Sequence, residues 1–305
     1  MRSLGAIALI LAVALSGSPA QGRDGAVVVA SKIDTEGALL GNMILAMLRG
    51  HRITVESRLQ LGPTNILRAA ILAGQVDIYP EYTGNGALFF HKEQDPAWKN
   101  WERGYALVAA LCREENHLVW LKPAPANNTW VIAVRKEMAE RRHLASMEDF
   151  ARFVNEGGRI KLAASAEFVE SPSALPAFEA TYSFRLSDEQ LLTLSGGNTA
   201  ATLRAAAEEM SGVNAAMAYG TDGALAALGL VALRDDKGAQ IVYAPAPVIR
   251  EATLQEHPEI PTALDPVFAT LTLDTLQKLN AEIAVNGQQA AVVATAYLQS
   301  KNFLP

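Results

Sequence analysis

The chain has 305 residues, of which 50% are hydrophobic and 19% charged, so it can bury a large core and does not have the composition of a disordered protein. Its formal net charge is -6, without a long basic run or a basic helix face, which argues against nucleic acid and anionic membrane as partners. One large or two medium domains are expected at this length.

The first twenty residues have the composition of a secretory signal peptide. Arg2 precedes an apolar stretch over residues 4–15, and small residues end the segment at Ala20. The stretch is too short for an ordinary transmembrane helix, and no later segment approaches the roughly 18 apolar residues that a membrane span needs. We therefore expect a cleavable leader over residues 1–20 and an exported protein. No cysteine lies near the predicted cleavage point, so a lipid anchor is not expected.

Strands and helices alternate after the leader. A β-rich run at 27–31 is followed by apolar residues at helical spacing over 39–48, a predicted strand at 53–61, a helix at 64–73 and the short strand VDIY at 76–79. This order predicts an α/β layer with a mostly parallel sheet. The centre repeats the pattern and the tail after about residue 261 is predicted to be helical, with strands near 130–135, 160–164 and 214–218 and helices around 146–154, 174–181 and 198–210.

Two polar, turn-rich stretches predict crossings between two lobes. They are PAPANNTW at 123–130 and AYGTDG at 218–223, and a new strand is expected after each. They divide the chain into a first lobe over 26–128 and 221–305 and a second lobe over 129–220. A cleft between such lobes is a favoured ligand position, because both lobes contribute groups and closure removes water.

Metal and disulfide chemistry have no sequence support. Cys112 is the single cysteine and lies among apolar residues at helical spacing, which predicts a buried structural thiol. The five histidines are scattered without an HExxH pattern, so no zinc site is expected.

The segment DIYPEYTGNGALFF at 77–90 is the strongest local sign of a ligand site. Its apolar run ends at Tyr79, and a glycine-flanked turn then presents a ring at Tyr82, a hydroxyl at Thr83 and an amide at Asn85. We predict that this turn lines a small-molecule cleft.

Five ordered motifs carry a resemblance to a known family. SKIDTEGALLGN (31–42), DIYPEYTGNGA (77–87), PAPANNTW (123–130), LAASAEF (162–168) and MAYGTDG (217–223) resemble the substrate-binding proteins of osmoprotectant ABC importers, in particular the OsmF/YehZ-like branch of glycine betaine, choline and proline betaine binders. The resemblance implies a periplasmic binding protein with a type II-like, two-lobed α/β fold, two hinge crossings and no cofactor. It also implies a monomer that captures a quaternary ammonium compound and delivers it to a membrane permease and an ATPase.

The family holds the ammonium head in an aromatic cage, which suits a cation without N–H donors. Carried over position by position, the resemblance implies cage rings at Tyr82, Trp130 and Tyr219 and polar or carboxylate-end contacts at Lys32, Asn85 and Asn128. The full set of predicted site residues is Lys32, Tyr82, Thr83, Asn85, Asn128, Thr129, Trp130, Glu167, Phe168, Tyr219 and Thr221.

One departure from the family pattern concerns the ligand's carboxylate. The betaine binders tend to carry an arginine three residues after the phenylalanine of the third motif, and Ser171 stands there in this chain. Loss of a bidentate carboxylate clamp weakens betaine binding or shifts the preference to another ligand.

Two other functions remain as hypotheses. The same fold could bind a different small solute, such as an amino acid derivative. An enzyme would need a nucleophile with a base, a metal cluster or a cofactor loop, and the chain has neither GxSxG nor GxGxxG. Glu167 and Asp222, 55 positions apart, are interpreted as structural or capping acids rather than an acid/base pair, and Thr199 as a helix-starting residue.

Overall fold

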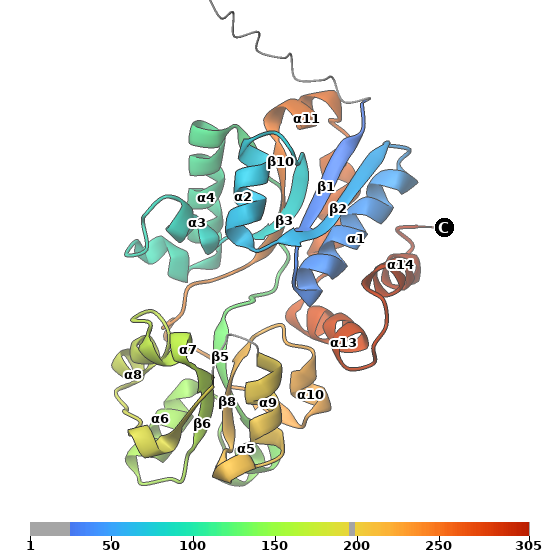
Figure 1. Cartoon of the computed structure of the whole chain (residues 1–305). Coiled ribbons are helices and arrows are strands. Elements are labelled where there is room, and N and C mark those ends of the chain that lie inside the picture. The colour runs from blue at the N-terminus through green and yellow to red at the C-terminus, as the bar shows by residue number, and fades with distance from the viewer. Residues whose placement is uncertain (1–24, 195–198, 305) are drawn as a thin grey trace, which may run out of the picture.

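Among residues 25–194 and 199–304, which the computed structural model describes, two five-stranded sheets flanked by helices form two lobes (Figure 1). The strand order is β2-β1-β3-β10-β4 in the first sheet and β7-β6-β8-β5-β9 in the second. This confirms the predicted two-lobed α/β fold. The predicted leader over 1–20 lies outside the described residues.

The first sheet consists of β1 (Val27–Lys32), β2 (Val55–Gly62), β3 (Ile78–Tyr82), β4 (Leu118–Trp120) and β10 (Pro245–Arg250). The helices of the first lobe and the tail are α1 (Thr35–Gly50), α2 (Thr64–Leu72), α3 (Asn85–Phe89), α4 (Trp101–Asn116), α11 (Glu251–Glu256), α12 (Ile260–Ala269), α13 (Leu273–Ala284) and α14 (Ala290–Ser300).

The second sheet consists of β5 (Trp130–Arg135), β6 (Leu162–Ser165), β7 (Leu191–Leu194), β8 (Ala215–Tyr219) and β9 (Leu230–Ala232). The helices of this lobe are α5 (Lys136–Arg142), α6 (Met147–Asn155), α7 (Ala166–Glu170), α8 (Leu175–Tyr182), α9 (Thr199–Ala207) and α10 (Ala224–Ala227).

Each sheet is parallel except for the strand that enters from the other lobe. β1 pairs in parallel with β2 and β3, whereas β10 is antiparallel to β3 and β4. In the second sheet β6 is parallel to β7 and β8, and β5 is antiparallel to β8 and β9. The direction of β5 and of β10 follows from the crossings, because the chain enters each sheet through this strand from the side of the other lobe.

The first sheet buries side chains on both faces. Val27 and Val29 of β1 pack into a cluster with α1, α12 and α14, whereas Val28 and Ala30 pack into a second cluster with α2 and α4. Covered on both sides, the strand is apolar from Val27 to Ala30, which explains the continuous run VVVA in the sequence. Cys112 lies fully buried in the second cluster, as predicted.

The second sheet is built in the same way. Ile132 and Val134 of β5 face a cluster that contains aromatic residues of α6 and α8, and Val131 and Ala133 face a cluster with α9. Successive residues of a strand point to opposite faces, so one short segment joins both cores of the lobe.

The first crossing is where the sequence predicts it, and the second is not. β4 belongs to the first sheet and β5 to the second, so the chain crosses over residues 121–129. β9 still belongs to the second sheet and β10 to the first, so the return runs over residues 233–244. The crossing predicted at 218–223 is therefore wrong, and residues 221–232 belong to the second lobe rather than the first.

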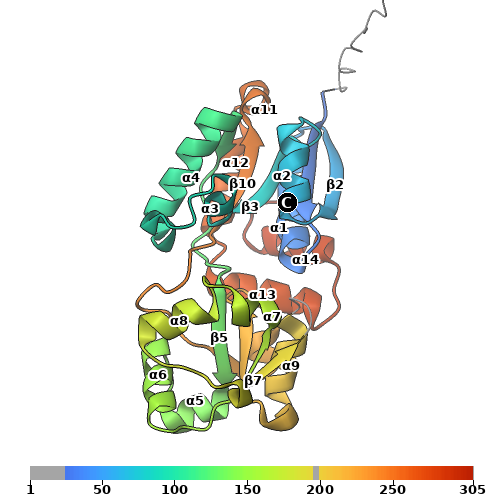
Figure 2. The same ribbon diagram turned by 60° about the vertical axis from the view of Figure 1, so that its left-hand side comes forward.

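The AYGTDG segment has a packing role that explains its glycines. A Cβ atom at Gly220 would clash with the Asn127 carbonyl oxygen, and one at Gly223 would clash with the backbone of Ala281 in α13. The Gln277 side chain of α13 also donates to the Gly220 carbonyl at 2.7 Å. The turn formers serve this close approach between backbones, and α13 lies where the two lobes meet (Figure 2).

The predicted turn after Tyr79 is also corrected. β3 continues to Tyr82, and its antiparallel partner β10 places Pro247 opposite Pro80 and Pro245 opposite Tyr82. Two prolines fit opposite each other because alternate pairs of an antiparallel ladder exchange no N–H bonds. Tyr82 is therefore held in a sheet rather than in a loop.

None of the helices among the described residues is long and apolar enough to cross a membrane.

Candidate functional site

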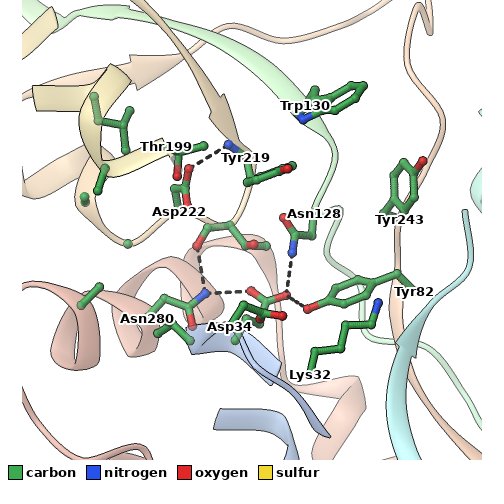
Figure 3. A pocket seen from close by; sticks show the side chains of 18 of the residues that line it. Lys32, Asp34, Tyr82, Asn128, Trp130, Thr199, Tyr219, Asp222, Tyr243 and Asn280 are labelled. Atoms are coloured by element: carbon green, nitrogen blue, oxygen red, sulfur yellow. Dashed lines mark hydrogen bonds between the residues drawn. The ribbon is translucent and has the colours of Figure 1, made fainter. Parts of the chain in front are cut away.

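A cavity of about 790 Å³ lies between the lobes, and β1, β3, both crossings, the second lobe and α13 all contribute to its wall (Figure 3). Its lining residues are Lys32, Asp34, Thr35, Glu36, Thr64, Tyr82, Asn85, Asn128, Trp130, Glu167, Thr199, Ala200, Leu203, Tyr219, Thr221, Asp222, Gly223, Ala224, Tyr243, Asn280 and Ala284.

Most of the predicted site residues meet at this cavity although they are far apart in sequence. Those that line it are Lys32, Tyr82, Asn85, Asn128, Trp130, Glu167, Tyr219 and Thr221. Those that do not are Thr83, Thr129 and Phe168.

Thr83 and Thr129 fasten the second crossing instead of lining the cavity. The Thr129 hydroxyl donates to the Ile241 carbonyl at 2.7 Å, and the Thr83 hydroxyl donates to the Val242 carbonyl at 3.1 Å. The Ala244 N–H in turn donates to the Thr83 oxygen at 3.1 Å. Thr129 therefore holds the second crossing to the first, and Thr83 holds it to the end of β3.

Phe168 supports a cavity residue from behind. It is fully buried in the core of the second lobe and meets the Trp130 ring edge-on, with centroids 5.8 Å apart and an interplanar angle of 89°. The contact fixes the orientation of the indole that faces the cavity.

Four aromatic side chains line the cavity from both lobes and the second crossing. Tyr82 ends β3, Trp130 begins β5, Tyr219 ends β8, and Tyr243 lies in the second crossing. Burial raises the pKa of Tyr82 and Tyr219 and raises the pKa of Tyr243 to about 12, so all three phenols are neutral at ordinary pH. Neutral rings present faces that attract cations.

The sequence reasoning missed several lining residues, and Tyr243, Glu36 and Asn280 matter most. Tyr243 was missed because the second crossing was predicted at 218–223 and none of the five family motifs covers residue 243. Glu36 stands inside the first family motif. Asn280 has no local signal, because only the folding back of α13 brings it to the cleft.

Glu36 receives hydrogen bonds from three parts of the molecule. The Tyr82 hydroxyl donates to its Oε1 at 2.8 Å, Asn128 Nδ2 to Oε1 at 3.2 Å, and Asn280 Nδ2 to Oε2 at 2.7 Å. The same Asn280 nitrogen donates to the Thr221 carbonyl of the second lobe at 3.0 Å. The carboxyl group thus connects α1, β3, the first crossing and α13, and through Asn280 the second lobe.

The Glu36 carboxyl group has no basic partner among the contacts of the described residues. Burial raises the pKa of this group to about 7, against hydrogen bonds from Thr221, Asn280 and Tyr82 that lower it, and the charge of Asp34 raises it further. Asn128 and Asn280 direct their NH₂ groups at it while each Oδ1 stays buried without a partner.

Lys32 is the one basic side chain among the described residues that line the cavity, and it already has a partner. Its Nζ lies 2.5 Å from Oε1 of the fully buried Glu81 and 4.6 Å from the centroid of the Tyr82 ring. Glu81 also accepts from the Asn85 amide at 2.7 Å. Four acids, namely Asp34, Glu36, Glu167 and Asp222, line the same cavity, so its wall is acidic.

The acids and Thr199 that were interpreted as structural also reach the cavity. Asp222 accepts from the Tyr219 N–H at the end of β8 at 2.8 Å, which is a structural contact, and burial raises its pKa. Thr199 begins α9 as predicted. Ser171 is the C-cap residue of α7, pairs with the Ser173 hydroxyl at 3.0 Å and does not line the cavity.

The described residues contain no group of three or more histidine, cysteine, aspartate or glutamate side chains placed to hold a metal ion.

A comparison with known families assigns the chain. The model of the substrate-binding domain of ABC-type glycine betaine transport systems matches residues 25–300. The chain belongs to this family. It is a substrate-binding protein of this class of transport system, and its fold is the two-lobed fold of periplasmic binding proteins.

Individual relatives agree with the family. The chain is 58% identical over 277 residues to the glycine betaine-binding protein YehZ of Escherichia coli K12, with 91% of each protein covered. It is 31% identical over 265 residues to a glycine-betaine-binding protein of Pseudomonas aeruginosa, covering 84% of this chain and 81% of that protein. The solved structure of apo YehZ from Escherichia coli superposes with a TM-score of 0.84 at 57% identity, covering 91% of this chain and 99% of that one.

Proposed function

We propose that the interlobe cavity captures a quaternary ammonium compound of the glycine betaine class. The observation that carries this proposal is the set of four aromatic side chains, Tyr82, Trp130, Tyr219 and Tyr243, around one acidic cavity. A quaternary cation offers no N–H donor, so ring faces and carboxylates are the groups that hold it best. Each ring contact is worth about 0.5 to 2 kcal/mol, depending on how far water is excluded.

Polar residues of the cavity are proposed to place the rest of the ligand. Asn85, Asn128 and Thr221 offer amide and hydroxyl groups on three sides, and Glu167 lies on the wall of the second lobe. Lys32 is the proposed contact for a ligand carboxylate, shared with its partner Glu81. Thr83, Thr129 and Phe168 contribute indirectly, by holding the hinge and the Trp130 ring.

Closure of the lobes is the proposed means of capture. Rings from both lobes face the cavity, so a ligand that contacts all of them stabilises the closed arrangement more than the open one. The crossings at 121–129 and 233–244 are the segments that change conformation when the lobes approach.

The proposed setting is an ABC importer of the bacterial inner membrane. The protein would act in the periplasm as a monomer without chemical turnover and present the closed form to the permease, whose ATPase drives release. The predicted leader over 1–20 supports export.

A second candidate ligand is a small solute of another kind, such as an amino acid derivative. It is favoured by the carboxylate end of the cavity: Ser171 does not reach the lining, and Lys32 is paired with Glu81. A cavity with this charge gives a ligand carboxylate less stabilisation than a free arginine would.

The test is a calorimetric titration of the exported, purified protein with glycine betaine, choline, proline betaine, carnitine and common amino acids. We expect one-to-one binding of a quaternary ammonium compound, recovered unchanged, with a change in tryptophan emission because Trp130 lines the cavity. Binding of amino acids alone would move the assignment to the second candidate. Absence of binding by every quaternary compound would overturn the proposal, and a chemically altered ligand would indicate an enzyme.

A further inference from the structure

Glu36 is a buried carboxyl group on the wall of the cavity. It is 5% exposed, and its described hydrogen-bond donors, Tyr82, Asn128, Thr221 and Asn280, are all uncharged. A buried carboxylate without a counter-charge is costly, and proteins normally give it a basic partner. Here the partner that would offset this cost is a cation inside the cavity.

We propose that Glu36 sets the preference for a cationic head group. It supplies the counter-charge of the ligand and orients the Tyr82 ring. Ligand affinity therefore depends on the ionisation of Glu36. This inference rests on the proposed function.

None of the charged side chains around Glu36 described below supplies a positive counter-charge for it. On its own helix Asp34 caps α1 by accepting from the Gly37 N–H at 2.7 Å, and it adds a like charge. Lys32 of β1 is bound to Glu81. The second lobe contributes Glu167 and Asp222, while the first crossing and α13 contribute the neutral amides of Asn128 and Asn280.

Glu36 also acts on the position of the cage. Because the Tyr82 hydroxyl donates to Oε1, the carboxylate determines where the ring points, and the Asn128 amide links it to the hinge. Protonation weakens both contacts, since a neutral carboxyl oxygen is a poorer acceptor than a carboxylate. Deprotonation of Glu36 therefore both creates the negative charge that attracts the ligand and strengthens the hydrogen bond that orients the Tyr82 ring.

The sign of the pH dependence follows from burial. Burial raises the pKa of Glu36 to about 7, so the group is largely protonated at pH 6 and largely ionised at pH 8. A bound cation favours the ionised form and lowers this pKa. Affinity should therefore rise with pH, by about tenfold from pH 6 to pH 8 if only the ionised form binds, because about nine-tenths of the protein is protonated at pH 6.

The experiment measures dissociation constants of choline and of glycine betaine by calorimetry at half-unit steps from pH 5.5 to pH 8.5. Neither probe changes its charge in this range, since choline has no acid or base group there and a carboxylate near an ammonium ionises at much lower pH. We expect affinity to increase with pH for both probes. In Glu36→Gln the profile should be flat and the affinity should lie at or below that of the wild type at pH 5.5.

Tyr82→Phe is the second variant, because it keeps the ring and removes one donor to Glu36. With that donor gone the carboxylate is less stabilised, so the midpoint of the profile should move to higher pH. Glu56→Gln, a change at an exposed acid of β2 outside the cavity, is the matched control and should keep the wild-type profile.

The outcomes separate the two proposals. If neither probe binds the wild type at any pH, the proposed function fails. If both bind with the same affinity at pH 6 and pH 8, or if the slope persists in a folded Glu36→Gln protein, the inference about Glu36 is overturned and the proposed function stands. A persistent slope would direct attention to Asp222, whose pKa burial also raises.

Discussion

Two buried carboxyl groups of the first lobe, Glu81 and Glu36, have opposite surroundings. Glu81 is fully buried and has Lys32 at 2.5 Å, the Tyr79 hydroxyl at 3.1 Å and the Asn85 amide at 2.7 Å. Glu36 faces the cavity and has only uncharged donors among its described hydrogen bonds. The same chemical group has a charged partner in one place and lines a cavity without one in the other.

Tyr82 joins these two regions. Its backbone N–H donates to Glu81 at 2.8 Å, its hydroxyl donates to Glu36 at 2.8 Å, and the Lys32 ammonium group lies over its ring. Glu81 and its partners, the Glu81 cluster, therefore hold the backbone of Tyr82, and Glu36 holds its hydroxyl group. A cage ring held at both ends loses little conformational entropy when a ligand arrives.

The largest effect is expected at the buried ion pair between Lys32 and Glu81. Glu81→Gln leaves the Lys32 charge buried without compensation, and we expect a loss of about 3 to 5 kcal/mol in the free energy of unfolding. Urea denaturation followed by circular dichroism measures it. Glu56→Gln is the control, because its pair with Arg58 is exposed and should be worth at most about 1 kcal/mol.

A double variant sharpens this comparison. Adding Lys32→Met to Glu81→Gln removes the stranded charge, so part of the lost stability should return. If Glu81→Gln destabilises no more than Glu56→Gln, the structural role of the Glu81 cluster is wrong.

The next effect concerns the residue shared by both regions. Tyr82→Ala removes a ring from the cavity and should weaken binding of the quaternary ligand at least about tenfold while the protein stays folded. Calorimetry at pH 8 gives the dissociation constants. Tyr105→Ala deletes a ring outside the cavity and should leave the affinity unchanged. An unchanged dissociation constant in Tyr82→Ala would remove this residue from the cage.

The smallest effect is expected at Thr129 in the hinge. This residue has no described hydrogen bond to Glu36 or Glu81. Thr129→Val removes the 2.7 Å hydrogen bond between the two crossings and should cost about 1 kcal/mol of stability. Thr295→Val is the matched control, because its hydroxyl donates to Ala291 within the exposed face of α14. Equal thermal unfolding of the two variants would show that the crossings are not held together at Thr129.

The strands β1 and β5 were predictable because each is buried on both faces. VVVAS and the run at 130–135 are apolar at nearly every position, and such runs correspond to β1 and β5. The end of β3 was not predictable, because Pro80 and Glu81 are turn-like in sequence and become strand residues only beside β10. The second crossing failed for a similar reason, since the pairing of β9 with β5 decides where the lobe ends.

Two of the three errors in the predicted site, Thr83 and Thr129, follow from side-chain alternation, whereas Phe168 lies in the helix α7 and turns into the core. Asn128 and Trp130 line the cavity while Thr129 between them points to the second crossing, and Thr83 turns away next to Tyr82. Successive residues of an extended segment point to opposite sides, so a motif identifies the segment but includes residues of both faces.

The sequence by itself determined the α/β class, the apolar faces that build two cores, the family, and part of the cleft, namely the rings of Tyr82, Trp130 and Tyr219 and the amides of Asn85 and Asn128. All of these depend on local periodicity or on short motifs. Only the tertiary structure decided which carboxyl group receives a cation. Lys32 and Glu81 are 49 positions apart, and Glu36 and Asn280 are 244 apart. Contacts over such separations arise from the packing of whole lobes and of α13, and no local pattern in the chain encodes them.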